Sequence, residues 1–215
     1  VRLQLNMLVN SLHLRQVHCV IGGSFGGMQA LEFAVQAGSR GEWAEFPASS
    51  QAEPFVKSAI VIACGATHTA WQIGLSEVQR QAIYADMNWP LNAWEATQGL
   101  AIARQIGMVS YRTPQGYRNH FGRNKMPPAK PTKKQQEKEI QEHSPAYGKD
   151  TKWCVKSYLE YQGQKFLPRF DPITYVKMTE QMDSHDLSRG RTEIEGDVAT
   201  VLARVDIPIL VMGID

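Results

Sequence analysis

The chain has 215 residues, of which 43% are hydrophobic and 20% are charged, and its formal net charge is +2. These values suit one globular domain or slightly more, and they exclude a disordered chain. No apolar run reaches the roughly 18 residues of a membrane span, so we do not expect a membrane protein. Three scattered cysteines are too few for a disulfide framework or a zinc site. We therefore expect a reducing, cytoplasmic location and no bound metal.

The small positive charge is concentrated in one segment. Residues 125–152 hold seven lysines and four acidic residues, so this Pro-, Lys- and Gln-rich stretch alone exceeds the net charge of the whole chain. Its composition is typical of a solvated polar loop that cannot bury enough apolar surface to order itself. No stacking aromatic residues alternate with its lysines, so we expect no nucleic-acid partner.

The first third of the chain alternates between helical and strand-like patterns. Apolar residues at helical spacing predict a helix over residues 1–12. Short apolar runs rich in β-branched residues predict buried strands at 17–21 and 58–64, with a helix at 28–35 between them. The segment from 38 to 54 has the composition of a loop. This order of helices and strands indicates a parallel sheet covered by helices.

The middle of the chain, residues 70–191, has helical periodicity and no strand-like apolar run. The helices that we expect there cover residues 71–85, 98–110, 155–163 and 173–182. Residues 192–215 return to the earlier pattern, with a helix at 197–205 and a strand at 208–214. We therefore expect an α/β core, residues 1–69 and 192–215, with an all-helical lid, residues 70–191, inserted into it.

One short motif carries the chemistry. Gly22-Gly23-Ser24-Phe25-Gly26 matches the G-x-S-x-G nucleophile elbow, and it lies between a predicted strand and a predicted helix, as the elbow requires. The sharp turn would hold Ser24, the expected nucleophile, in a strained conformation. We expect Gly22 and Gly26 to let the neighbouring segments approach closely. The backbone N–H of Phe25 is the expected oxyanion-hole donor.

Two plainer interpretations of the motif compete with the elbow. One is a glycine-rich turn with an incidental serine; the other, a phosphate-binding loop, fits poorly because the spacing is neither G-x-x-x-x-G-K nor G-x-G-x-x-G. A serine nucleophile also needs an acid and a histidine, which in this fold follow the serine after later strands. The six histidines stand before Ser24, too soon after the second strand, or in the helical segment. We expect the triad Asp and His to lie outside this chain, beyond Asp215.

Longer segments resemble the homoserine O-acetyltransferase family, in the family's order and over most of the chain. They are GGSFGGMQALEFAV, SAIVIACGATHTAWQIGLSEVQRQAIYAD, GLAIARQIGMVSYRTPQGYRNHFGR and SYLEYQGQKFLPRFDPITYVKMTEQMDSHDLSRGR. The elbow combined with QGxKFxxRFD and DSHDxxRGR is far more specific than G-x-S-x-G alone. The resemblance implies an α/β-hydrolase fold with a helical lid, and usually a homodimer paired through the lids.

The resemblance implies ping-pong acyl transfer in methionine biosynthesis. Ser24 would take an acetyl group from acetyl-CoA, the co-substrate, and the γ-hydroxyl of L-homoserine would then attack the acyl-serine. No permanently bound cofactor is implied. Arg104 matches the family arginine that holds the homoserine carboxylate, and Tyr111 matches a tyrosine near the same substrate. An arginine fork suits a carboxylate because it can bind both oxygens.

Several departures and alternatives accompany this resemblance. Residues 38–53 are longer than the usual family connection, which suggests a surface insertion. The chain starts at Val1 and stops on an apolar strand, so we expect an internal part of a longer enzyme that is inactive by itself. The alternatives are serine O-acetyltransferase, a homoserine or serine O-succinyltransferase, an esterase of the same fold, or a non-catalytic segment.

The other conspicuous side chains of the helical segment have ordinary structural interpretations. The large aromatic residues are expected to pack within it rather than to contact a substrate: Trp71, Trp89, Trp94, and the pair Phe166 and Phe170. Three acidic residues are expected to cap helices or to form ion pairs with nearby arginines: Asp171, Asp183 and Asp186, with Arg169, Arg189 and Arg191.

Overall fold

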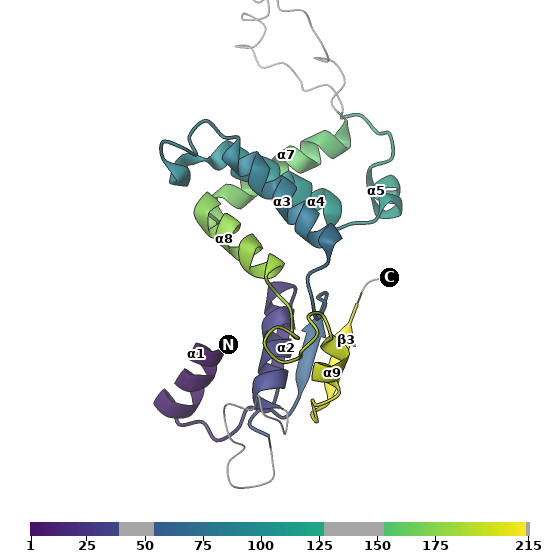
Figure 1. The fold of residues 1–215 in the computed structure, drawn as a ribbon. Helices are drawn as coiled ribbons and strands as arrows, with labels where there is room; N and C mark the ends of the chain where they lie inside the picture. The colour runs from purple at the N-terminus through teal and green to yellow at the C-terminus, as the bar shows by residue number, and fades with distance from the viewer. Residues whose placement is uncertain (39–53, 127–152, 214–215) are drawn as a thin grey trace, which may run out of the picture. The chain divides into compact units, whose positions relative to one another are not determined.

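The computed structural model describes residues 1–38, 54–126 and 153–213. The chain divides into two compact units, which Figure 1 shows by their elements. The core unit comprises Val1–Gln72 and Glu180–Asp215, and the helical unit comprises Ile73–Thr179. The expected surface insertion and the expected polar loop lie almost wholly outside the described residues. Within the described ranges, no helix is long and apolar enough to cross a membrane.

The core unit contains a parallel sheet of three strands in the order β1 (Val20–Gly23), β2 (Ala59–Ile62) and β3 (Ile209–Met212). Val20 is opposite Ala59, and Ala59 is opposite Ile209. The first strand was expected at residues 17–21. The observed strand starts and ends later, at Val20–Gly23, and so includes two glycines of the motif. Parallel neighbours need a crossover connection, and the helix α2 lies in the first of them.

One face of this sheet is covered by α2 (Phe25–Ala37), α1 (Arg2–Asn6) and α9 (Val198–Leu202). In Figure 1, α2 lies along the strands. Its apolar residues recur at helical spacing and pack against Ala59 and Val61, which point to the same face because strand side chains alternate. Each fully buried aliphatic side chain contributes about 1.5–3 kcal/mol. This packing fixes the position at which β1 ends and α2 begins.

The opening helix is less regular than its apolar spacing predicts. After α1 the chain continues as a π-helical segment, Met7–Ser11. The helix expected at 197–205 is also shorter, because it covers only Val198–Leu202 and the carboxylate of Asp197 caps it by accepting from the N–H of Thr200. The predicted pattern of helix, strand, helix and strand is nevertheless confirmed, and so is the parallel sheet.

The helical unit is built from α3 (Ala70–Tyr84), α4 (Thr97–Ser110), α5 (Pro114–Phe121), α7 (Cys154–Phe166) and α8 (Pro172–Asp183). Short 3-10 turns cover Ala93–Glu95 and Leu167–Arg169. Its apolar centre joins α3, α4 and α8 through Ile83, Leu100 and Val176. The four helices expected here are present, each within three residues of the expected ends. No strand occurs among the described residues of this unit.

Candidate active site

Ser24 occupies a strained turn between β1 and α2. Its φ is 53° and its ψ is −121°, which residues with a Cβ rarely adopt. The turn is fixed on both sides, because the Ser24 N–H donates to the carbonyl of Ile62 (2.8 Å). The Ser24 carbonyl accepts from the N–H groups of Gly27 (2.8 Å) and Met28 (3.1 Å). The strained strand-to-helix turn expected of a nucleophile elbow is therefore present, and Ser24 is exposed.

The glycines of the motif have unequal roles. A Cβ on Gly22 would lie 1.9 Å from the carbonyl oxygen of Gly26, so only glycine fits at position 22. A Cβ on Gly27 would lie 2.7 Å from the Cys64 sulfur. A Cβ on Gly26 would meet nothing within 4 Å. The expectation that a glycine is needed for close approach is right for Gly22 and wrong for Gly26. The carbonyl of Gly26 is the group that approaches Gly22, whereas the Cα of Gly26 itself has open space around it.

Replacing Gly22 by alanine should lower the free energy of unfolding by about 3 kcal/mol, because the new methyl group meets backbone atoms that cannot rotate away. Urea denaturation would measure this. The matched change is Gly26→Ala, which sits in the first turn of α2 with open space around it and should be neutral or stabilising by up to about 1 kcal/mol. Equal losses in the two variants would contradict this explanation of the motif.

Phe25 begins α2, and this position determines what its backbone can do. The first N–H groups of a helix have no acceptor in a preceding turn, and the helix dipole places partial positive charge there. The N–H groups of Gly27 and Met28 are already bonded to the carbonyl of Ser24. No acidic residue stands in the first turn of α2. The Phe25 N–H thus lies one peptide away from Ser24, in a place that favours an anionic oxygen.

The second pair of expected site residues lies in the helical unit. Arg104 is a half-buried residue of α4, and Tyr111 is the C-cap of the same helix. The guanidinium carbon of Arg104 lies 4.8 Å from the ring centroid of Phe166 and 5.8 Å from that of Tyr111. Among the described residues, no carboxylate forms an ion pair with Arg104. Its N–H donors are held between two rings and can bind an anion.

The DSHDLSRGR segment is joined to α2 by an ion pair that the sequence did not indicate. Arg191 binds both carboxylate oxygens of Glu32, at 3.0 and 2.7 Å, and also donates to the carbonyl of Leu187. Gln36 donates to the same carboxylate at 2.6 Å. Burial acts to raise the pKa of Glu32, but the hydrogen bonds and charge of Arg191 outweigh it and leave that pKa lowered. The segment is thereby fastened to the helix that follows Ser24.

The expected partners in this segment need correction. Arg191 pairs with Glu32 rather than with a nearby aspartate, and Asp183 pairs with His68 at 3.1 Å. The other two aspartates accept from backbone N–H groups. Asp171 is a helix cap, as expected, whereas Asp186 lies in a turn that begins no helix. Asp171 accepts from Thr174 at the start of α8, and Asp186 accepts from Ser188.

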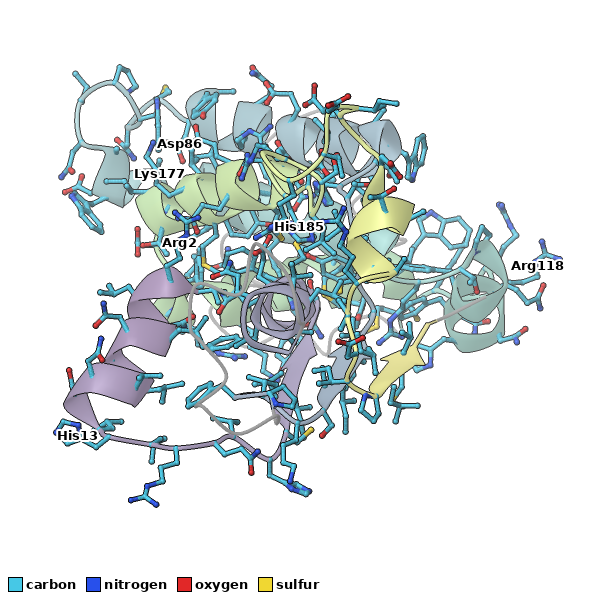
Figure 2. The ribbon with its side chains drawn as sticks, turned by 60° about the horizontal axis from the view of Figure 1, so that its bottom comes forward. Arg2, His13, Asp86, Arg118, Lys177 and His185 are labelled. Carbon is cyan, nitrogen blue, oxygen red and sulfur yellow. The ribbon has the colours of Figure 1, made fainter. Side chains whose placement is uncertain are left out.

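His185 lies beside α2 and is labelled in Figure 2. Burial lowers its pKa, and its Nε2 atom has no hydrogen-bond partner in the part of the chain that is described. A cavity of about 570 Å³ follows this face of α2 from Phe25 to Gln36, with His185 in its wall. Across the described ranges, no group of three or more His, Cys, Asp or Glu side chains could hold a metal ion.

The parallel strands, the strained Ser24 turn and the helix that begins at Phe25 define the chain as an α/β-hydrolase-fold protein. No family model matches the chain. It is 41% identical over 211 residues to homoserine O-acetyltransferase from Salinibacter ruber, covering 96% of this chain and 50% of that protein. It is 40% identical over 221 residues to homoserine O-acetyltransferase from Chloroherpeton thalassium, covering 100% and 47%. The chain belongs to the homoserine O-acetyltransferase family and spans about half the length of the curated relatives it matches.

Solved structures agree on the fold. Homoserine O-acetyltransferase from Bacillus anthracis matches with a TM-score of 0.70 and 16% identity, over 99% of this chain and 48% of that one. The acetyl esterase MekB matches with a TM-score of 0.65 and 20% identity, over 96% and 48%. At these identities the likeness concerns the fold alone. Transferases and esterases share it, so the fold does not decide between them.

Proposed function

We propose that the protein containing this chain is an acyltransferase of methionine biosynthesis that moves an acetyl group from acetyl-CoA to L-homoserine. The observation that carries the proposal is Ser24, held with φ at 53° in the strand-to-helix turn, directly before Phe25, the first residue of α2. Relatives that are 40–41% identical are named homoserine O-acetyltransferase. A strained serine at a helix N-terminus suits covalent catalysis of acyl transfer.

The reaction has two half-reactions. In the first, Ser24 Oγ attacks the thioester carbonyl while a histidine outside this chain accepts its proton. The Phe25 N–H stabilises the oxyanion, and coenzyme A leaves as a thiol. In the second, the γ-hydroxyl of L-homoserine attacks the acyl-serine and gives up its proton to the same base. O-acetyl-L-homoserine leaves, and Ser24 regains its proton.

Arg104 is proposed to hold the carboxylate of the acceptor, and Tyr111 to contact the same molecule. The rings of Phe166 and Tyr111 restrict the guanidinium of Arg104, so less freedom is lost when two parallel hydrogen bonds form. The acceptor must also compete with water for the acyl-serine. We propose that the helical unit, Ile73–Thr179, forms the lid that excludes water from the acyl-serine. We also propose a homodimer through these lids and a cytoplasmic location.

Replacing Arg104 by lysine should raise the KM for L-homoserine about 10- to 100-fold, because the charge stays but the two-pronged hydrogen bonding is lost. The rate of Ser24 acetylation by acetyl-CoA should not change, since the acceptor takes no part in that step. Steady-state and single-turnover kinetics would measure the two effects. Arg118→Lys on the exposed surface of α5 is the matched control, and an equal rise of KM there would contradict the assignment.

The overall proposal is tested by separating transfer from hydrolysis in the full-length protein that contains this chain. Acetyl-CoA alone should acetylate Ser24, and L-homoserine should then remove the acetyl group as O-acetyl-L-homoserine. L-serine and succinyl-CoA, used in place of the two substrates, distinguish the related transferases. Thioester hydrolysis that L-homoserine neither speeds nor diverts would instead indicate an esterase. The 215-residue chain should not turn over acetyl-CoA, because we propose that the catalytic base lies outside it.

A further inference from the structure

The helical unit contains a long segment that has basic residues and no acidic ones. Residues 96–126 include no Asp or Glu, and they hold five cations: Arg104, Arg112, Arg118, Arg123 and Lys125. All of these except Arg104 are exposed. Arginines elsewhere in the chain have carboxylate partners, as in the pair of Arg191 with Glu32, but none of the five forms an ion pair among the described residues. The segment therefore presents positive charge that nothing in the described chain neutralises.

Two of these cations lie beside one aromatic ring. The guanidinium carbon of Arg123 lies 5.0 Å from the ring centroid of Trp153, and Nζ of Lys125 lies 5.5 Å from the same centroid. Trp153 directly precedes α7 and forms an antiparallel bridge with Lys125. The N–H of Cys154 also donates to the carbonyl of Asn124 at 3.0 Å. These backbone contacts hold both cations beside the start of α7, close enough together for one ligand to contact both.

A third cation is held by the packing of α5 against α7. The guanidinium carbon of Arg112 lies 5.5 Å from the ring centroid of Tyr158 in α7. That ring packs against the buried Phe121 of α5, with centroids 4.9 Å apart. An aromatic face restricts a cation without using its N–H donors, which stay available for an anion. Arg112, Arg123 and Lys125 are thus ordered by rings and still able to bind.

Phosphate is the anion that suits such exposed cations, because it carries several acceptor oxygens and more charge than a carboxylate. The proposed acyl donor, acetyl-CoA, has a diphosphate and a 3′-phosphate at its nucleotide end. Its long pantetheine arm separates these groups from the thioester. The phosphates therefore need a site at the surface, away from the serine that reacts with the thioester. Basic residues that are exposed and take no part at Ser24 match this need.

We propose that Arg123 and Lys125, together with Arg112, bind the phosphate groups at the nucleotide end of the acyl donor. The inference rests on the proposed function for the identity of the donor as acetyl-CoA. It assigns recognition of the nucleotide to the helical unit, separately from the chemistry at Ser24. The site recognises the nucleotide and not the acyl group, so it does not distinguish acetyl-CoA from succinyl-CoA.

The test compares two donors in the full-length protein: acetyl-CoA and S-acetylpantetheine, which has the same thioester and no nucleotide. The preference for acetyl-CoA, taken as the ratio of the two kcat/KM values for Ser24 acetylation, should fall about 10- to 100-fold in the double variant Arg123→Gln, Lys125→Gln, because two charge-assisted contacts are lost. The loss should lie in the KM for acetyl-CoA and not in kcat. Each single variant, and Arg112→Gln, should show part of it. Equal losses of kcat/KM for both donors would overturn the inference and leave these residues with a structural role only.

Lys165→Gln is the matched control for Lys125→Gln. Lys165 is an exposed lysine in the last turn of α7, and its Nζ lies 5.3 Å from the ring centroid of Tyr161, so it also pairs a lysine with an aromatic ring in the same unit. Its preference for acetyl-CoA should be unchanged. A loss as large as that of Lys125→Gln would mean that the overall positive charge of the unit attracts the donor, and it would contradict a defined site.

Nucleotide binding separates this inference from the proposed reaction. In full-length Ser24→Ala, which forms no acyl-enzyme, calorimetry should show that adenosine 3′,5′-bisphosphate binds, that coenzyme A displaces it, and that salt weakens it. Binding should be at least about tenfold weaker in a protein that also carries Arg123→Gln and Lys125→Gln. Absence of binding, or tighter binding of a single-stranded oligonucleotide that coenzyme A does not displace, would contradict the inference. Absence of acetyl-serine in the original protein, with this binding intact, would contradict only the proposed reaction.

Discussion

Replacing Ser24 by alanine in the full-length protein should lower the rate of acetyl transfer by on the order of 10⁴-fold or more, because no acyl-enzyme can form. Release of the coenzyme A thiol would measure the rate, and mass spectrometry would show whether the peptide containing Ser24 carries an acetyl group. Ser11→Ala, which changes an exposed serine at the end of the Met7–Ser11 segment, should leave both results unchanged.

Stability distinguishes loss of the nucleophile from loss of the fold. Ser24 has a φ of 53°, a conformation that glycine adopts without strain. Ser24→Gly should therefore be inactive and yet more stable than the original protein, by about 1 kcal/mol in the free energy of unfolding. An inactive Ser24→Gly variant that is also destabilised would argue against a strained elbow. Retention of most activity in Ser24→Ala would contradict the role of Ser24 itself.

Much of the fold follows from local sequence signals. The β-branched runs around Val20 and Ile60 and the apolar spacing of α3, α4, α7 and α8 indicate their own structure, because each face is buried over several residues. The elbow is equally local, since one pentapeptide holds both the serine and the glycine that it needs. Helix α5 was missed because its eight residues, PQGYRNHF, are mostly polar, although Thr113 caps it and Pro114 begins it.

The errors in packing arise where the environment of a residue depends on distant segments. Trp71 and Trp94 were expected to pack within the helical segment, yet they are 77% and 61% exposed among the described residues. Trp89, by contrast, packs against Tyr84 with ring centroids 5.0 Å apart. Helical periodicity marks a helix but does not show which of its large apolar residues finds a neighbour.

The polar contacts of the candidate site lie beyond local patterns for the same reason. Glu32 and Arg191 are 159 residues apart in the chain. Nothing in their spacing relates one partner to the other. The DSHDLSRGR segment could be recognised only as a motif. Its contact with α2 depends on how the last part of the core unit folds against the first.

Replacing Arg191 by methionine should lower the free energy of unfolding by about 3–5 kcal/mol at pH 7, because it leaves the carboxylate of Glu32 buried without its cation. The Arg191 and Glu32 side chains are only 12% and 20% exposed, so solvent cannot replace the lost partner. Arg189→Met is the matched control. That arginine is exposed, forms no ion pair among the described residues, and its loss should cost no more than about 0.5 kcal/mol.

The variation with pH of the stability lost in Arg191→Met tests whether the buried carboxylate of Glu32 causes that loss. In the original protein the pKa of Glu32 is lowered, so its contribution to stability is present above the unfolded pKa, near 4.5, and is lost as the pH falls through the lowered value. Without Arg191, burial raises that pKa above 4.5 and penalises the charged form. The deficit of Arg191→Met should therefore be largest at pH 7 to 8 and shrink as the pH falls toward 5.

The double variant Arg191→Met, Glu32→Gln completes this test. A neutral amide at position 32 has no charge to bury, so at pH 8 the double variant should recover at least half of the stability lost by Arg191→Met. The deficit that remains relative to the original protein should no longer vary between pH 5 and pH 8. Denaturation curves at pH 5 and pH 8 would show this. A deficit that is equal at both pH values, or one that Glu32→Gln deepens, would mean that Arg191 stabilises the chain mainly through the Leu187 carbonyl.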